Sequence, residues 1–85
     1  MSISVATRDP RIADVDVSDT TLTVTLRDGR TIAAPLDWFP RLKNATPEAR
    51  TAWEPAAAGH GIHWPRIDED LSVEGLLQGQ PAAGG

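Results

Sequence analysis

The sequence has no cysteine and no tyrosine, and only one phenylalanine and one methionine among its 85 residues. Without cysteine the chain has no disulfide, no thiolate zinc site and no cysteine nucleophile. Its longest apolar runs, such as residues 33–36, are far shorter than the ~18 residues that a membrane-spanning helix needs. The N-terminus has no basic stretch followed by an apolar one, so we expect no secretory signal. These absences predict a cytoplasmic protein with a single small domain and no membrane contact.

Basic residues are scarce in the last part of the chain. Residues 1–53 contain seven basic and seven acidic side chains, whereas residues 54–74 contain Arg66 against five acids, so the net charge of −4 arises in this second segment. Proteins that bind nucleic acids usually have a basic face that displaces the counterions of the phosphates. We therefore expect no nucleic-acid partner, and a basic protein is the better match for the acidic segment.

The first half of the sequence alternates apolar and polar residues with a period of two, which is typical of half-buried antiparallel strands. Three segments share this pattern, and their expected inward residues are Ala13, Val15 and Val17, then Leu22, Val24 and Leu26, then Ile32 and Ala34. Together they predict a three-stranded meander with one apolar face.

The loop lengths determine which of these side chains share a face. A four-residue connection places Val17 opposite Leu22. For the next pair we favour a three-residue loop with Gly29 as a left-handed bulge, because it pairs Val24 with Ile32. A two-residue turn would leave Ile32 on the solvent face.

The second half of the sequence predicts two short helices and one more strand. Thr46 and Pro47 are typical of a helix start, and this helix is expected to run to about Glu54 with Ala49, Ala52 and Trp53 as its buried stripe. Residues 62–64 are expected to form a fourth strand. Ser72 is expected to cap a last helix, whose buried stripe is Val73, Leu76 and Leu77.

The predicted fold class is therefore α+β, with a small antiparallel three- to four-stranded meander sheet and one or two short helices packed on one face. We expect a flexible N-terminus over residues 1–10, a single domain over residues 11–79 and a disordered tail over residues 80–85. The residues expected to have structural roles are Gly29, Thr46, Pro47, Trp53 and Ser72.

Two histidines precede a run of acids, which raises the possibility of a metal-binding or acid–base enzyme. This alternative would use His60, His63 and either Asp68 or Asp70. However, His60 and His63 would point to opposite faces of an extended segment. The favoured interpretation is that His60 lies in a glycine loop and His63 at a sheet surface, while the acids start or cap the following helix or pair with Arg66 and Arg50. We therefore predict no catalytic residue, no metal site and no cofactor.

The segment from Trp38 to Arg41 is the most unusual candidate for a contact surface. Two adjacent aromatic side chains on a turn cannot both point the same way, and tryptophan and arginine are enriched at interface hot spots. In the alternative interpretation, both aromatics close the edge of the sheet as part of the core. The predicted partner-binding residues are Trp38, Phe39, Arg41, Trp64, Asp68, Glu69 and Asp70. An open edge strand or the threonine-rich sheet face could also pair with another chain.

Four stretches give the sequence a more specific resemblance. Residues 22–30, 35–42, 44–50 and 61–73 resemble, in order and spacing, a bacterial family known as domain of unknown function 2442, and the resemblance extends from about Asp14 to Gly79. The Ala56-Ala57-Ala58 stretch and the tail depart from it.

The resemblance implies a small α+β domain and assigns no activity to any residue. Some family members are parts of larger proteins that carry a helix-turn-helix, and some genes are paired with another small protein in the manner of toxin–antitoxin modules. By analogy this implies a binding role. The leading hypothesis is a non-enzymatic protein-interaction module, antitoxin-like or adaptor-like, with a protein partner or self-association.

Overall fold

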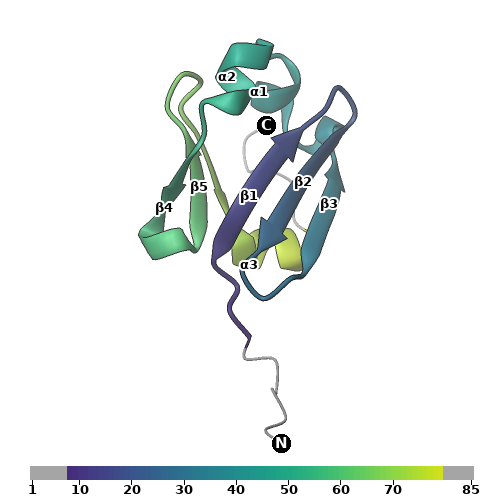
Figure 1. The fold of residues 1–85 in the computed structure, drawn as a ribbon. Helices are drawn as coiled ribbons and strands as arrows, with labels where there is room; N and C mark the ends of the chain where they lie inside the picture. Colours follow the sequence, from purple (N-terminus) through teal and green to yellow (C-terminus); the bar gives the residue numbers. More distant parts are fainter. Residues whose placement is uncertain (1–7, 80–85) are drawn as a thin grey trace, which may run out of the picture.

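The computed structural model describes residues 8–79 and consists of two three-stranded antiparallel sheets connected and covered by short helices (Figure 1). Sheet A contains β1 (Ile12–Val17), β2 (Thr21–Leu26) and β3 (Thr31–Pro35) in that order. Sheet B contains β4 (Glu54–Ala56), β5 (Gly61–Trp64) and β6 (Glu69–Ser72) in that order. The α+β class is confirmed. The second half contributes a whole sheet where one strand was expected.

Sheet A has the register that the sequence predicts. Val24 is opposite Ile32 and Val17 is opposite Leu22, so the apolar side chains of the three strands share one face. The turn between β2 and β3 is closed by the Leu26 N–H, which donates to the Arg30 carbonyl at 2.8 Å. Gly29 has a φ of 94°, a left-handed conformation that glycine adopts without steric cost.

One strand position was predicted wrongly. A β-bulge between Ile12 and Asp14 shifts the pairing of β1 with β2. Ile12 and Val15 are therefore buried, and Ala13, expected on the apolar face, is exposed. A bulge adds one residue to one strand. Before the bulge, the residues that face the core are therefore the ones that simple alternation predicts to face solvent.

The helices are all short. After β3 come the 3₁₀ helix η1 (Leu36–Trp38), α1 (Pro40–Lys43) and α2 (Pro47–Thr51), while the 3₁₀ turn η2 (Ala57–Gly59) connects β4 to β5, and α3 (Val73–Leu77) follows β6. The two predicted caps are confirmed, since the hydroxyls of Thr46 and Ser72 accept hydrogen bonds from the N–H groups of Ala49 and Gly75 at 3.1 and 3.0 Å.

The extents of two predicted helical faces need correction. Helix α2 ends at Thr51, so Ala52 and Trp53 lie beyond it, although Trp53 still packs against the core. The helix stops early because Glu54 pairs with His63 of β5, which requires an extended chain. In α3, Val73 and Leu76 are buried as expected, but 47% of Leu77 is exposed.

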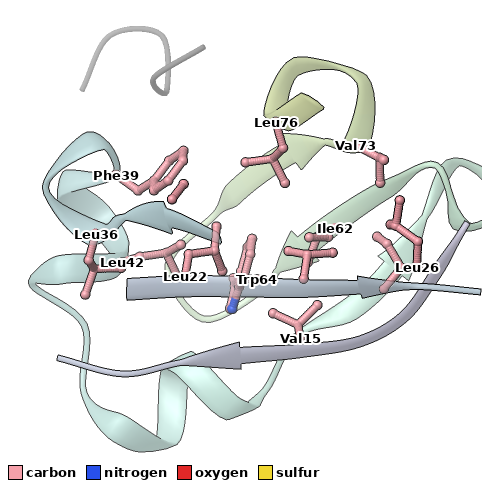
Figure 2. Packing of buried hydrophobic residues seen from close by; sticks show 13 residues of the cluster. Val15, Leu22, Leu26, Leu36, Phe39, Leu42, Ile62, Trp64, Val73 and Leu76 are labelled. Carbon is pink, nitrogen blue, oxygen red and sulfur yellow. The ribbon is translucent and has the colours of Figure 1, made fainter. Parts of the chain in front are cut away.

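A single apolar cluster connects the two sheets (Figure 2). The inward side chains of sheet A meet Ile62 and Trp64 of β5 on one side, and Val73 and Leu76 of α3 complete the cluster. Its largest fully buried members are Trp64 and Phe39. The core therefore lies between the two sheets, and side chains from the short helices also belong to it, among them Leu36, Leu42, Val73 and Leu76.

We predicted a flexible N-terminus and a disordered tail, and most of these residues, 1–7 and 80–85, lie outside the part of the chain that the structure describes. Within the described part, Asp9 is held against the β2–β3 turn, where the Asp28 N–H donates to its carbonyl at 3.2 Å and its own N–H donates to the Asp28 carboxylate at 3.1 Å. Over residues 8–79 the structure contains no helix long and apolar enough to span a bilayer.

Candidate functional site

Two of the aromatic residues predicted to bind a partner belong to the core. Phe39 and Trp64 have no exposed surface, so neither can contact a partner in this conformation. Trp64 is further fixed by its indole N–H, which donates to the Arg50 carbonyl at 3.1 Å. Trp38 is half-buried, and its ring meets the Phe39 ring in an edge-on contact with centroids 6.5 Å apart. The sheet junction needs large apolar side chains, which explains why these aromatics are buried.

Three of the remaining predicted partner residues, Asp68, Glu69 and Asp70, lie in the turn between β5 and β6 and at the start of β6. Arg41 of α1 reaches this turn, where its guanidinium donates to the Asp68 carbonyl at 2.8 Å. Asp68 has a positive φ of 51°, which aspartate tolerates better than most residues. Glu69 accepts a hydrogen bond from the Asp70 N–H at 3.1 Å. These contacts hold the turn in place, and the partner role of Trp38, Arg41, Asp68, Glu69 and Asp70 stays a prediction.

The two histidines lie in different surroundings. His63 occupies the middle of a cross-strand row on sheet B, opposite both Glu54 and Asp70, and its Nδ1 lies 2.8 Å from Asp70 Oδ1. His60 lies outside this row, in the connection before β5. Within residues 8–79, no three histidine, cysteine or acidic side chains are grouped so that they could hold a metal ion. The arrangement gives no support to the metal-dependent alternative.

A concave surface surrounds His60 instead. Its larger part has a volume of about 510 Å³ and is lined by Pro10, Ala57, His60, Ser72, Val73, Glu74 and Leu77. Its smaller part, about 400 Å³, lies beside the first and shares Ala57, His60 and Ser72 with it. The smaller part extends over Gly61 towards Asp70 and Leu71. We call the two parts together the His60 hollow.

The hollow is bordered by a left-handed turn. Ala57, Ala58 and Gly59 have φ values of 51°, 56° and 91°, and the His60 N–H closes the turn by donating to the Ala57 carbonyl at 3.1 Å. L-residues resist this conformation because Cβ approaches the following carbonyl. The His60 carbonyl in turn accepts a hydrogen bond from the Val73 N–H at 3.0 Å, which joins the turn to the start of α3.

The charge around the hollow is acidic. Glu74 and Asp70 line it, and among residues 8–79 no arginine or lysine lines it. Arg11 packs against the border at Gly59, because a Cβ placed on Gly59 would lie 3.1 Å from the Arg11 Cβ. Its guanidinium is bound to Asp9, with Nε 2.9 Å from the carboxylate, and this hydrogen bond is the main reason that the pKa of Asp9 falls to about 2.

The residue types alone do not predict this hollow. Leu77 was expected on a buried stripe, and the alanines at 56–58 were noted only as a departure from the family pattern. An alanine–glycine run between two extended segments does indicate a turn, but nothing in the residue types predicts two consecutive alanines with positive φ. Of the residues proposed for a catalytic, metal or partner site, His60 and Asp70 line the described part of the hollow, and the predicted helix cap Ser72 lines it as well.

Comparison with known proteins places these features in context. A family model described as "Protein of unknown function (DUF2442)" matches residues 12–82. The crystal structure of a protein of unknown function from Rhodospirillum rubrum ATCC 11170 is 33% identical, with 87% of this chain and 92% of that chain covered and a TM-score of 0.71. The solution NMR structure of an uncharacterized protein from Chromobacterium violaceum is 24% identical, covers 87% and 70% of the two chains with a TM-score of 0.73, and shows similarity of fold alone. No curated protein matches the sequence.

Proposed function

The chain belongs to the DUF2442 family of proteins of unknown function, and from this premise we propose that it is a non-enzymatic protein-interaction module. Its partner contact is the His60 hollow. The observation that carries the proposal is Leu77, the exposed large apolar side chain of the described residues, which lies at the border of an apolar hollow. Exposed apolar surface next to a concavity is typical of a site that another molecule covers.

The partner that best matches this surface is a protein segment with an apolar side chain beside a lysine or arginine. The apolar side chain would fill the larger part of the hollow, against Val73 and Leu77. The basic group would approach Glu74 and Asp70, since the described lining contains no arginine or lysine, although Asp70 also contacts His63. Complementary charge at the border of an apolar contact increases specificity and the association rate.

The same surface supports a neutralising or adaptor role towards a small basic protein. The surface acids and the net charge of −4 favour such a partner over nucleic acid, whose phosphates would be repelled. The partner is expected to bind stoichiometrically, and its gene is expected to lie beside the gene of this chain.

Two glutamates allow a matched test of the contact surface. Glu74 and Glu48 are both exposed and both lie in the first turn of a short helix, but only Glu74 lines the hollow. The protein that co-purifies with the chain from its native host would be identified, and its affinity measured by calorimetry for the wild type and for each glutamate-to-lysine variant. We expect Glu74→Lys to weaken binding about tenfold or more, because like charges would face each other.

Glu48→Lys is expected to leave the affinity within about twofold of the wild type, since it removes the same helix-terminal charge outside the hollow. Leu77→Ser provides the apolar counterpart and should also weaken binding. Equal affinities for Glu74→Lys and Glu48→Lys would exclude the hollow as the contact surface. Failure to recover any stoichiometric protein would contradict the interaction role itself.

A further inference from the structure

Within residues 8–79 the two sheets leave four strand edges, and three of them are protected against pairing with another chain. Strand β1 has a bulge and two acidic residues, Asp14 and Asp16. Strand β4 has only three residues, one of which is Pro55. Strand β6 begins with the acids Glu69 and Asp70. Charge, proline, shortness and bulges are the features with which natural sheets avoid edge-to-edge association.

Strand β3 lacks most of these protections. Residues Thr31–Pro35 contain no charged side chain, their pairing with β2 has no bulge, and the single proline is the last residue of the strand. In Figure 1, β3 is the outermost strand of sheet A on the side away from β1. Its outer edge is therefore the most suitable of the four for strand addition.

The hydrogen-bond pattern shows which backbone groups this edge presents. Bonds from the Leu26 N–H to Arg30 and from the Leu36 N–H to Thr20 bracket the β2–β3 ladder. Bonded and non-bonded pairs alternate in an antiparallel ladder, so Ile32 and Ala34 bond to β2. Thr31 and Ala33 consequently direct their N–H and C=O groups outwards, and no described residue bonds to them.

We propose that β3 pairs with β3 of a second copy of this chain to form a two-fold symmetric, six-stranded sheet. The two-fold axis passes between the two Ile32 residues. Thr31 of each copy is then opposite Ala33 of the other, and both donors and both acceptors on each edge find a partner, which gives four hydrogen bonds. This proposal is independent of the proposed partner contact, because no residue of β3 lines the His60 hollow.

The side chains of β3 are compatible with a second copy of the chain at this edge. The two Ile32 side chains, half-buried in one copy, face each other in the close, non-hydrogen-bonded pair on the inner face. No like charges are placed opposite each other, whereas the same operation on β1 would bring Asp14 and Asp16 against their counterparts. A two-fold contact uses the same patch on both copies, and this strand is complementary to itself.

The interface is small, so the dimer is expected to be weak. A single pair of five-residue strands lies below the ~1,000 Å² that a stable complex usually buries. We expect dissociation constants of roughly hundreds of micromolar, which are typical of a transient contact.

The test is the oligomeric state of the full chain, measured by sedimentation equilibrium from about 20 µM to about 1 mM. The wild type should change from mostly monomer at the lowest concentration to about half or more dimer at the highest. Ala33→Pro should stay monomeric, because proline removes only the outward N–H and leaves the bonds of Ile32 and Ala34 to β2 intact. Ala33→Val is the matched control, and it should dimerise like the wild type because it keeps the N–H.

Amide hydrogen exchange of the wild type provides a second measurement that needs no variant. Protection of the Thr31 and Ala33 amides should increase with protein concentration. The amides of Val15 and Val17 should not change; they point outwards from β1 because the Ser18 N–H bonds to Thr21 and bonded positions alternate along the strand. A wild-type chain that is monomeric throughout would overturn the proposal. A dimer that persists in a folded Ala33→Pro variant, or that forms without added protection at Thr31 and Ala33, would overturn it as well.

Discussion

Replacing Ala58 with glycine should stabilise this protein, although most substitutions in a folded domain destabilise it. Ala58 has a φ of 56° and a ψ of 33°, it is exposed, and it does not line the His60 hollow. Its left-handed conformation costs alanine about 1–2 kcal/mol. Glycine avoids this cost, but it also loses about 0.4–1 kcal/mol more conformational entropy on folding. The net gain in the free energy of unfolding is about 0.5–1 kcal/mol.

Urea denaturation, followed by tryptophan fluorescence, measures this gain. For a domain of this size the free energy of unfolding falls by about 1 kcal/mol per molar urea, so the midpoint should rise by about 0.5–1 M with an unchanged slope. Ala56→Gly is the matched control, because Ala56 has an extended backbone with φ −133° and ψ 164°. There glycine relieves no strain, and we expect a loss of about 0.5–1 kcal/mol.

The two glycine variants are expected to change the free energy of unfolding in opposite directions, and this difference allows the reasoning to be refuted. If Ala58→Gly lowered the midpoint as much as Ala56→Gly does, the turn would not be left-handed in solution. The geometry of the hollow border would then be wrong as well, because Ala57 in the same turn lines the hollow.

Two further substitutions test the core and the charged end of sheet A. Trp64→Phe removes the indole N–H that bonds to Arg50 and leaves unfilled volume in the core, so it should cost about 2 kcal/mol; an unchanged urea midpoint would contradict this. The pKa of Asp9 is lowered to about 2 by its hydrogen bond with Arg11, and that of Asp28 is lowered by its hydrogen bond with Arg30. A carboxylate with a lowered pKa stabilises the folded state fully above its unfolded value of 3.8, and this stabilisation is lost as the pH falls towards 2. Urea midpoints measured between pH 5 and about pH 2 should therefore fall less in Asp9→Asn than in the wild type, and parallel decreases would refute the assignment.

The first sheet could be predicted from the sequence because its signals are local. Alternation with period two identifies the strands, and the preference of Gly29 for positive φ selects the loop that pairs Val24 with Ile32. The bulge at Ile12 could not be predicted, since an extra residue on one strand leaves no mark in residue type. Helix caps at Thr46 and Ser72 are equally local and were predicted for the same reason.

The second sheet depends on contacts between distant residues, and this explains why only one of its strands was predicted. Strand β4 contains a proline and an alanine, which are poor strand residues, and it exists because β5 pairs with it. Strand β6 reads as an acidic run, and its pairing with β5 places Asp70 against His63. In both cases the pairing with β5 outweighs the local preference of the residues, and this pairing cannot be inferred from a single sequence.

The same packing explains why the contact surfaces differ from those that the aromatic residues suggested. A small domain with two sheets needs large apolar side chains at the sheet junction, and Phe39 and Trp64 are fully buried there. With those aromatics in the core, the features that can attract a partner are the apolar border at Leu77, the acids beside it and the unpaired backbone of β3. The acidic segment is visible in the sequence, but which acids border an apolar hollow and which strand edge is left open depend on how the chain folds. A search for function in related chains should therefore begin with strand edges and surface hollows, since the largest aromatic side chains of a domain this small are needed to fill its core.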